Sequence, residues 1–469
     1  MAQDFIVLGG GIAGLATAYE LLKRGHRVRL IERSSEVGGL ARTFEREGFR
    51  FDIGGHRFHS NNPSVVQWLK DLLKEDLLVV PRVSHIHLNG RFAEYPIVFP
   101  QALTIFSPIK AVEMIASYLL AKVREARRAD VSFEDWVVRR YGWALYRVFF
   151  EPYTEKVWGI PCTELSAAWA AQRIGIPSMW RAIKHALVAP KEQLATAISH
   201  FYYPRAGFGM FPAALAREIA ALGGRIDTDT SLLQCTPLEV GGFEVTSQHK
   251  NGQVETLTAD HMVSTIPLNY LLQAIPDARN SPVSEVVAQL EYRDIMCLFV
   301  ALRSKQVSGD SWTYFPAKEL VFGRTHEPKN WSPEMVPDMG YTSLAIEIFA
   351  SRGEPIWALS DEALLAKVVE QMDGIGWFKA ADVHRSWVLR VPYAYPVYRI
   401  GYEEQLTEVH RYLSQWPNLH LVGRTGSFRY MNSDGVIEDV FRFISELTPD
   451  TADQSAPVQT LAGEVGRWV

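Results

Sequence analysis

Three glycines near the amino terminus, and a glutamate that follows them, are the residues whose spacing says most about chemistry. The apolar run at 5–8 leads into Gly9, Gly11 and Gly14, a helical pattern follows, and a second apolar run ends on Glu32. In such a unit the first glycine permits a tight turn, the second lets the backbone approach a pyrophosphate, and the third lets the helix pack close to the sheet. The helix amino terminus offers N–H groups to phosphates, and Glu32 is placed to accept hydrogen bonds from an adenosine ribose. The layout predicts a dinucleotide-binding βαβ unit, with a glycine turn that binds nothing as the alternative interpretation.

A second glycine pair favours FAD over NAD as the dinucleotide. The segment after the acidic strand reads Gly38-Gly39-Leu40-Ala41-Arg42, and Arg33 lies beside the ribose-binding position. The pair gives the backbone another close approach to a ligand, and Arg42 adds a cation. A nicotinamide site usually ends at the acidic residue, whereas the larger flavin dinucleotide needs added contacts. We therefore predict an FAD cofactor.

The segment Gly54-Gly55-His56 follows soon afterwards. Two glycines before a histidine suggest a backbone that passes close to a flat ring, with the imidazole beside it. An ordinary buried histidine is an equally open interpretation.

A helix that begins after Ser166 would carry Arg173. An arginine seven residues into a mainly apolar helix is costly to bury without a partner. A diphosphate would be a suitable partner through charge-assisted, bidentate hydrogen bonds. A structural ion pair is the open alternative.

Aromatic and cationic side chains recur in the second half of the chain. The residues concerned are Trp312, Tyr314, Arg324 and Asn330 on and after neighbouring predicted strands, and Tyr395 in a tyrosine-rich loop. The last such segment, from Gly423 and Arg424 to Tyr430, lies between a predicted strand and a predicted helix. The amino terminus of that helix can face the pyrophosphate or the pyrimidine end of a flavin.

The elements that must position these residues indicate an α/β protein. We expect a Rossmann-like FAD-binding domain (GR2-type), a helical insertion and an antiparallel-sheet substrate domain. The expected segments are the first part of the FAD-binding domain at 1–80, a sheet segment of the substrate domain at 81–100, a helical domain at 101–200 that could move over a substrate, the second part of the FAD-binding domain at 201–285, the antiparallel substrate sheet at 286–400, the closing part of the FAD-binding domain at 401–447, and a disordered tail at 448–469.

Composition narrows the class of protein. At 469 residues the chain exceeds what one core usually supports. The net charge of −5 argues against a general nucleic-acid binder, which would carry a basic face. Three widely spaced cysteines, Cys162, Cys235 and Cys297, suggest neither a disulfide framework nor a metal site, and we expect buried, reduced thiols in a cytoplasmic protein.

No apolar stretch reaches the length of a membrane span. The nearest candidate, residues 102–121, is interrupted by Pro108, Lys110 and Glu113. We expect an amphipathic helix that packs on the body of the protein, with peripheral membrane contact as the alternative.

From the amino terminus to about residue 445, the chain resembles the UDP-galactopyranose mutase family, in particular its larger members. This family lies within the superfamily of FAD-dependent amine oxidases and protoporphyrinogen oxidases. The segments that carry the resemblance are Gly54-Gly55-His56, Pro-Tyr-x-x-Lys-Val-Trp at 152–158, the set Trp312, Tyr314, Arg324 and Asn330, and Gly423-Arg424-x-Gly-Ser-Phe-Arg-Tyr430.

The resemblance implies a nucleotide-sugar pyranose–furanose mutase of polysaccharide biosynthesis. In such an enzyme N5 of the reduced flavin attacks the anomeric carbon, and the nucleotide diphosphate is the leaving group. Arg173 and Arg324 would grip the diphosphate, and His56 would lie near the flavin N5. The implied catalytic residues are His56, Arg173, Arg324, Tyr314, Tyr395 and Tyr430. The expected substrate-binding residues are Tyr95, Trp158, Arg173, Trp312, Tyr314, Arg324, Asn330, Tyr395 and Tyr430.

The expected cofactor-binding residues combine the glycine motifs with the residues that the resemblance adds. They are Gly9, Gly11, Gly14, Glu32, Arg33, Gly38, Gly39, Leu40, Ala41, Arg42, Gly54, Gly55, His56, Gly423 and Arg424. No metal ligand set is expected.

The chain departs from the family pattern after Tyr95. Where the family has polar amides that read the uracil, this chain has Ile97-Val98-Phe99. The nucleotide or carrier is therefore left open.

Two other functions fit the FAD motifs. An oxidoreductase of the protoporphyrinogen oxidase or amine oxidase type, acting on an apolar substrate, is favoured by the apolar change at 97–99. A non-catalytic FAD-binding protein is the third possibility. The sequence leaves the sugar, the reductant and the oligomeric state open.

Overall fold

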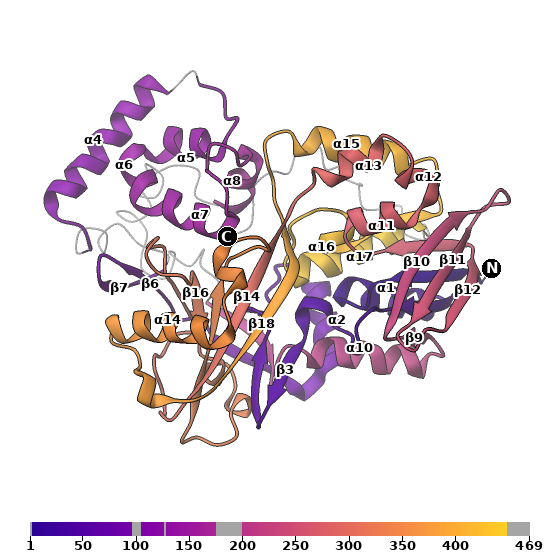
Figure 1. Cartoon of the computed structure of the whole chain (residues 1–469), viewed down its shortest axis with the longest axis horizontal. Coiled ribbons are helices and arrows are strands. Elements are labelled where there is room, and N and C mark those ends of the chain that lie inside the picture. The colour runs from indigo at the N-terminus through magenta and orange to yellow at the C-terminus, as the bar shows by residue number, and fades with distance from the viewer. Residues whose placement is uncertain (1, 96–104, 126–127, 175–198, 448–469) are drawn as a thin grey trace.

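The computed structural model describes residues 2–95, 105–125, 128–174 and 199–447. A parallel sheet with its helices, a long mixed sheet and a group of helices make up three regions (Figure 1). The expectations for Ile97-Val98-Phe99 and for the tail at 448–469 lie outside the described residues. The predicted fold class, α/β with a Rossmann-like domain, a helical insertion and a second sheet, is confirmed.

The parallel sheet has the strand order β19-β13-β1-β2-β9, and every pairing in it is parallel. Its strands are β1 (Asp4–Leu8), β2 (Arg27–Ile31), β9 (Arg225–Asp227), β13 (His261–Ser264) and β19 (Leu419–Leu421). The side chains of β1 alternate between two cores, as a strand buried on both faces requires. Phe5 and Val7 pack on one face, whereas Ile6 and Leu8 pack on the other.

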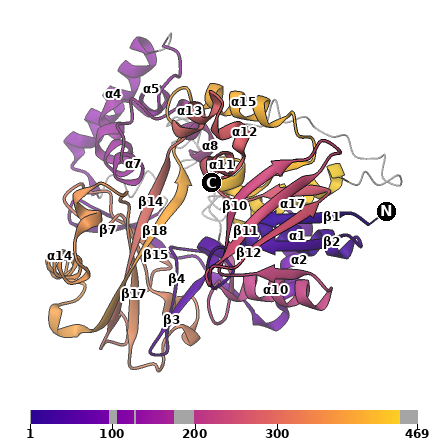
Figure 2. The same cartoon turned by 45° about the vertical axis from the view of Figure 1, so that its right-hand side comes forward.

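Helices cover the first face and a small sheet covers the second. The helices are α1 (Ile12–Lys23), α10 (Met210–Ala221) and α17 (Ser433–Leu447), with α2 (Pro63–Leu73) packed on α10. The small antiparallel sheet is β10 (Thr230–Pro237), β11 (Phe243–His249) and β12 (Val254–Ala259), seen in Figure 2 in front of the parallel sheet. Cys235 and Val245 from this sheet share a core with Ile6 and Leu8 of β1.

The long sheet has the order β18-β14-β17-β16-β15-β6-β7. Its strands are β6 (Ser84–Leu88), β7 (Arg91–Glu94), β14 (Tyr292–Leu302), β15 (Trp312–Tyr314), β16 (Arg324–His326), β17 (Thr342–Ile348) and β18 (Val383–Pro396). The helix α14 (Asp361–Gly374) packs against one face of it. The sheet was expected to be antiparallel, but β15 and β6 pair in parallel, because β6 comes from a distant part of the chain rather than from a hairpin with β15.

The helical region is inserted between β7 and β8 and comprises short helices. They are α4 (Pro108–Arg124), α5 (Phe133–Tyr141), α6 (Trp143–Leu145), a π-helical turn (Tyr146–Phe150), α7 (Glu151–Trp158) and α8 (Ala167–Arg173). Ser132 forms a capping box with Asp135 at the start of α5. Ser166 caps α8 as predicted, since its hydroxyl accepts a hydrogen bond from the N–H of Ala168 at 3.2 Å.

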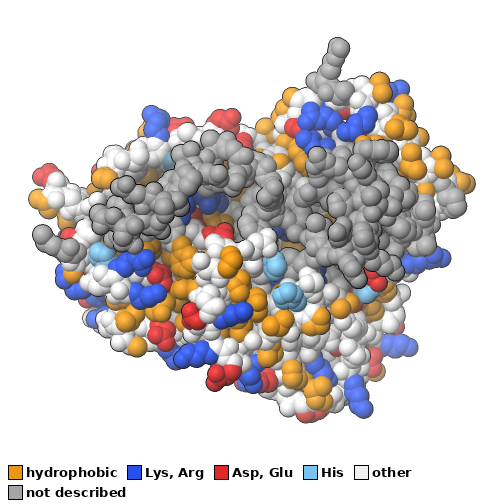
Figure 3. All heavy atoms as spheres, turned by 180° about the vertical axis from the view of Figure 1, so that it is seen from behind, with side chains coloured by type: hydrophobic (Ala, Val, Ile, Leu, Met, Phe, Trp, Pro, Cys, Tyr) orange, Lys and Arg blue, Asp and Glu red, His pale blue; other side chains and the backbone are white. Residues whose placement is uncertain are grey.

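The helix α4 packs on the body along one side only. Met114 and Ala121 are buried, whereas Ile109 and Val123 are 81% and 80% exposed on the other side. Figure 3 shows hydrophobic side chains along the outer edge of this region. In the part of the chain that the structure describes, no helix has both the length and the apolar character needed to cross a membrane.

Two short strand pairs and further helices connect these regions in the described part of the chain. The pairs are β3 (Thr43–Arg46) with β4 (Phe49–Asp52), and β5 (Leu77–Pro81) with β8 (His200–Pro204); the helices are α11 (Leu268–Ala274), α12 (Pro276–Arg279), α13 (Val283–Ala288), α15 (Tyr402–Leu413) and α16 (Gly423–Gly426). The pairing of β5 with β8 brings together the two chain segments that flank the helical insertion. All three cysteines are buried free thiols.

Candidate functional site

In the glycine turn between β1 and α1, some glycines are required by packing and another borders open space for a ligand. A Cβ on Gly14 would lie 1.9 Å from the carbonyl oxygen of Gly9, so no larger residue fits there. Gly9 has φ of +99°, a backbone conformation that favours glycine. A Cβ on Gly11 would meet nothing within 4 Å. The second glycine therefore borders open space, as the approach of a pyrophosphate requires.

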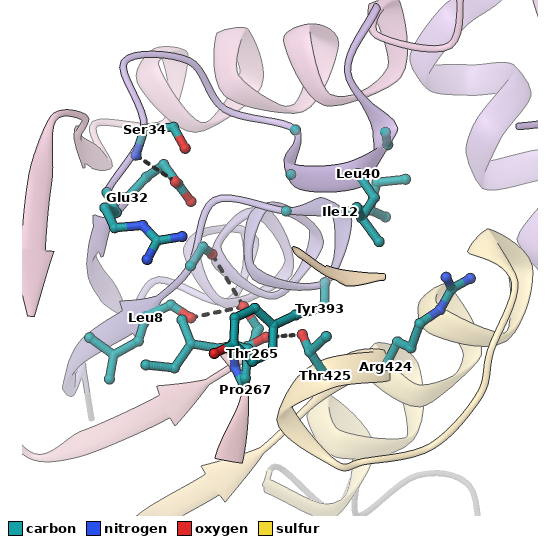
Figure 4. Close-up of a pocket in the computed structure, with 18 of the residues that line it drawn as sticks. Leu8, Ile12, Glu32, Ser34, Leu40, Thr265, Pro267, Tyr393, Arg424 and Thr425 are labelled. Carbon is teal, nitrogen blue, oxygen red and sulfur yellow. Dashed lines mark hydrogen bonds between the residues drawn. The ribbon is translucent and has the colours of Figure 1, made fainter. Parts of the chain in front are cut away.

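Glu32 lies at the end of β2, against this turn. Its carboxylate accepts hydrogen bonds from the N–H of Gly10 at 2.6 Å and of Ser34 at 2.7 Å. Figure 4 shows Glu32 and Arg424 at opposite ends of the cavity that the turn borders. The acidic residue is thus held in place before any ribose binds.

The cavity has a volume of about 540 Å³. The predicted cofactor residues that line it are Gly9, Gly11, Glu32, Arg33, Gly38, Gly39, Leu40, Ala41, Arg42, His56 and Arg424. Gly14, Gly54, Gly55 and Gly423 do not line it. Gly423 instead lets the backbone pass Ala13, because a Cβ on it would lie 2.4 Å from the Cβ of Ala13.

Several lining residues have no counterpart among the predicted ones. Thr265 follows β13, and its hydroxyl donates to the carbonyl of Leu8 at 2.8 Å, while Thr425 donates to the carbonyl of Thr265 at 2.8 Å (Figure 4). Tyr393 also lines the cavity, with φ of +59°. A non-glycine residue in this conformation is strained by about 1 kcal/mol or more, and such residues cluster at functional sites. The apolar, β-branched run at 262–266 was the signal that could have found Thr265.

His56 lies where the cavity meets the long sheet. Its ring lies on the ring of Phe208, with centroids 5.3 Å apart. Burial, together with the positive charges of Arg424 and Arg324, lowers the pKa of His56 to about 4. The imidazole is therefore neutral at physiological pH and can donate one hydrogen bond and accept another.

Arg324 forms an ion pair that the sequence did not reveal. Its Nε donates to Oε1 of Glu347 at 2.9 Å, and its Nη2 pairs with the second carboxylate oxygen. Glu347 is fully buried, and the same Oε1 accepts from the N–H of Gly55 at 2.9 Å. Because Glu347 neutralises its charge, Arg324 is less available to a diphosphate than an unpaired arginine. The available signal was a glutamate in the apolar run of β17.

Tyrosine side chains line the space between the long sheet and the helical insertion. The rings of Tyr95 and Tyr314 lie 4.7 Å apart, and Nε1 of Trp312 donates to the hydroxyl of Tyr314 at 2.7 Å. The rings of Tyr395 and Tyr430 stack 5.8 Å apart. Tertiary packing thus gathers aromatic residues from four separate segments.

Two arginines lie over the second of these tyrosine pairs. The guanidinium of Arg424 lies 5.3 Å from the ring of Tyr395 and 5.1 Å from that of Tyr430, and Arg173 lies 4.9 Å from Tyr430. Within the described residues, Arg173 forms no ion pair, so the structural alternative considered for it has no support. Arg424 also lines the cavity, so it joins the cavity to the tyrosine cluster.

These arginines change the acidity of the tyrosines. Burial raises the pKa of Tyr430, but Arg173, Arg424 and Arg324 outweigh it and leave the pKa below the ordinary value. Burial raises the pKa of Tyr395 to about 12. The Tyr430 hydroxyl is therefore the more acidic hydrogen-bond donor of the pair.

The remaining predicted substrate residues, Trp158 and Asn330, contact other residues of the site. Trp158 is buried, with its ring 6.2 Å from that of Tyr395. Both amide hydrogens of Asn330 are directed at carbonyls of the loop before β15, those of Ser308 at 2.9 Å and Asp310 at 2.8 Å. Asn330 therefore holds the loop before β15, and its contact with a substrate stays a prediction.

Other residues at the site were missed. They are Arg57, Arg82, Tyr153, His326 and Glu347. Arg57 lies 4.5 Å from the ring of Trp312. Its position directly after His56 was the available signal.

Comparison with known proteins agrees with this geometry. The family model of the flavin containing amine oxidoreductases matches residues 12–438. A probable UDP-galactopyranose mutase of Klebsiella pneumoniae is 24% identical over 173 residues, which cover 35% of this chain and 44% of that protein. Protoporphyrinogen oxidase 1, a chloroplastic protein of Arabidopsis thaliana, is 25% identical over 298 residues, which cover 57% of this chain and 53% of that protein. The chain thus spans about half the length of these curated relatives.

A solved structure of reduced UDP-galactopyranose mutase resembles this one with a TM-score of 0.82. The two share 20% sequence identity over 96% of this chain and 97% of that one, and this likeness shows the fold alone. The family model, by contrast, matches most of the sequence and describes flavin-containing enzymes. This protein therefore belongs to the flavin containing amine oxidoreductase family.

Proposed function

We propose that this protein is an FAD-dependent nucleotide-sugar pyranose–furanose mutase. The observation that carries the proposal is the group of arginine and tyrosine side chains beside the dinucleotide cavity, in which Arg173 lacks an ion pair among the described residues and Arg424 lies over two tyrosine rings. Guanidinium and phenol groups are suited to a diphosphate. An apolar substrate packed on these side chains would cover them without giving their polar groups partners, which is costly.

The residues that would hold FAD are those of the cavity. The open space at Gly11 fits a pyrophosphate, and Glu32 fits a ribose. When bound in its reduced form, FAD would supply the reactive ring. The neutral His56 and the arginine over Tyr395 and Tyr430 would border the ring end of the cavity.

The arginines would act on the leaving diphosphate. Arg173 would bind it directly, and the acidic hydroxyl of Tyr430 would donate to its oxygens. Such donors stabilise charge that develops as a bond breaks, because they are already oriented when the reaction begins. Arg324, held by Glu347, would contribute its remaining N–H groups and would fix Gly55 beside His56.

A second candidate is an oxidoreductase of the protoporphyrinogen oxidase or amine oxidase type. The bidentate pair of Arg324 with Glu347 favours it, because it removes one of the two cations expected to bind a diphosphate. The match to a protoporphyrinogen oxidase is in line with this alternative.

The experiment that separates the candidates uses the FAD-loaded protein reduced with dithionite. It is incubated with UDP-galactopyranose and a panel of other nucleotide sugars, and the products are separated by chromatography. A ring-contracted product that forms only with reduced flavin supports the mutase. No product with any sugar, together with flavin-dependent oxidation of a porphyrinogen or an amine, would replace the mutase with the oxidoreductase.

Peripheral membrane contact stays a prediction. It would use the exposed side of α4, where Ile109 and Val123 lie. Sedimentation with phospholipid vesicles tests it, and an Ile109→Gln, Val123→Gln variant should lose any binding.

A further inference from the structure

Two arginines that the proposed reaction does not use lie on one tryptophan ring. The guanidinium of Arg57 lies 4.5 Å from the centre of the Trp312 ring, and that of Arg82 lies 5.7 Å from it. Trp312 is only 5% exposed, and its indole N–H donates to Tyr314. The ring is therefore fixed, and the two cations on it are close enough for Arg82 to lower the pKa of Arg57.

Neither arginine of the pair is hydrogen-bonded to a carboxylate in the part of the chain that the structure describes. Among the described residues, neither Arg57 nor Arg82 forms an ion pair, and Nη1 of Arg57 is buried without a hydrogen-bond partner. The long-range influence of Asp434 reaches Arg57, but the two are not hydrogen-bonded. Outside the described residues, the sequence has acidic side chains at Glu192, Asp450, Asp453 and Glu464. A buried guanidinium donor without an acceptor costs about 1–3 kcal/mol or more, unless a ligand satisfies it.

Apart from Asp434 and Tyr314, the titratable groups that act on the pair are cationic or histidine side chains. Burial, with the charges of Arg82, Arg173 and Arg324, outweighs the opposite effect of Tyr314 and lowers the pKa of Arg57 to about 10. Burial lowers the pKa of His59 as well, with Arg57, His200 and Arg82 acting in the same direction. This concentration of positive charge is the kind of environment that an anion stabilises.

The positive charge exceeds what a diphosphate diester needs. Such a group carries about two negative charges, and Arg173 with the tyrosines is placed to bind it. Arg57 and Arg82 remain after that assignment, with Arg324 already balanced by Glu347. Arg57 interacts electrostatically with Tyr314, Arg173 and Arg324, so the unused cations lie beside the proposed substrate site.

We propose that Arg57 and Arg82 form a second anion subsite, which binds an acidic group, a carboxylate or a phosphate, on the sugar of the substrate. This inference rests on the proposed function, since it assigns Arg173 to the diphosphate. A planar guanidinium binds either group through paired hydrogen bonds. The substrate is accordingly an acidic sugar linked to a nucleotide, rather than a neutral hexose.

Calorimetric titration of the FAD-loaded protein tests the subsite without relying on turnover. The probes are galactose 1-phosphate, galacturonate 1-phosphate and galactose 1,6-bisphosphate, which share the anomeric phosphate and differ at C6. We expect the two acidic probes to bind at least tenfold more tightly than the neutral one. The tighter of the two identifies the group as carboxylate or phosphate.

Substitution of Arg57 assigns the difference to the subsite. Arg57→Gln should abolish the preference for acidic probes and leave the affinity for galactose 1-phosphate within about twofold, and Arg82→Gln should reduce the preference. The matched control is Arg147→Gln, because Arg147 also lies over a tryptophan, Trp143, but in the helical insertion. It should change nothing.

Two results would overturn the inference. The first is that the wild-type protein binds all three probes with equal affinity. The second is that Arg57→Gln loses affinity for all three probes to the same extent while its flavin absorbance is unchanged. If Arg57→Gln does not fold, the test relies on Arg82→Gln. An unchanged preference for the acidic probes in that variant would overturn the inference. An Arg57-dependent preference without any ring-contracted product would refute the mutase and leave the anion subsite in place.

Discussion

At the scale of single residues, Gly14 of the glycine turn is needed for folding and Gly11 is needed for ligand binding. A methyl group at Gly14 would collide with the carbonyl of Gly9, whereas one at Gly11 would enter open space. Both substitutions should prevent FAD binding, but for different reasons. The difference shows which glycine serves the fold and which serves the cofactor.

We predict that Gly11→Ala folds with nearly wild-type stability in the absence of flavin, yet loses FAD. Gly14→Ala should be unstable even without flavin, because a contact of 1.9 Å forces α1 away from the sheet. Thermal unfolding of the flavin-free proteins and FAD titration by fluorescence measure the two effects. Normal FAD affinity in Gly11→Ala would contradict the placement of the pyrophosphate.

His326 is a buried histidine without a hydrogen-bond partner for either ring nitrogen among the described residues. Its ring stacks on Trp331 with centroids 4.6 Å apart. Burial, with the charges of Arg324 and His56, lowers the pKa of His326 to about 3. The imidazole therefore stays neutral in the folded protein under conditions in which it is protonated in the unfolded chain.

This difference predicts a pH-dependent effect of His326→Phe. Because the folded pKa is lower than the unfolded one, the unfolded state binds the proton first, and the wild-type protein loses stability as the pH falls from about 6.5 toward 3. The free energy of unfolding of the variant minus that of the wild type should therefore be larger at pH 5 than at pH 8. The expected increase is about 2 kcal/mol. Urea unfolding at the two pH values measures it. If the free energies of unfolding of the variant and the wild type differ by the same amount at both pH values, His326 is not held neutral in the folded protein.

At the scale of elements, the pair of β16 with β17 carries the ion pair under the Gly54-Gly55-His56 segment. Glu347 in β17 binds Arg324 in β16 and the N–H of Gly55. A buried carboxylate that loses its cation is left with an uncompensated charge. The pair therefore couples the long sheet to the loop beside the cavity.

We predict that Arg324→Met lowers the free energy of unfolding by about 3–5 kcal/mol, because Glu347 is left unpaired. Adding Glu347→Gln should restore much of this loss, since an amide oxygen can still accept from Gly55. Chemical unfolding of the single and double variants tests the coupling. The control is Arg385→Met, which removes an exposed pair with Glu47 and should cost less than about 1 kcal/mol. No recovery in the double variant would mean that Arg324 acts through other contacts.

At the scale of the whole molecule, the dinucleotide cavity lies where several distant segments meet. Its lining comes from the amino-terminal turn, from residues 230–232 and 265–270, from 391–393 and from 424–436. A ligand that touches all of these segments stabilises the folded chain by mass action, because it binds only when they are assembled.

Removal of the flavin should therefore lower the stability of the whole chain. At free FAD about 100 times its Kd, binding adds about 2.7 kcal/mol to the free energy of unfolding, which raises Tm by several degrees. Thermal unfolding across an FAD concentration series measures the shift. A Tm that does not depend on the FAD concentration would mean that the cavity does not bind FAD. Gly11→Ala is the control, because its Tm should not depend on the FAD concentration.

Local patterns predicted much of this fold. The glycine spacing, the acidic strand end and the cap at Ser166 depend on neighbours in the sequence, and the structure has the strand, turn and helix where these signals lie. The parallel pairing of β15 with β6 was missed, because β6 lies far from β15 in the sequence and no turn signal links them.

The sequence by itself determined the βαβ unit and the positions of Gly9, Gly11 and Gly14, since tight turns and close packing impose residue types at fixed spacing. Only the tertiary structure decided the partners of the charged residues. It paired Arg324 with Glu347 and joined Asn330 to the loop before β15. It also placed Arg57 and Arg82 on one indole. The physical reason is that electrostatic and aromatic contacts depend on distance in space, and the residues that make them come from segments whose separation in sequence carries no signal.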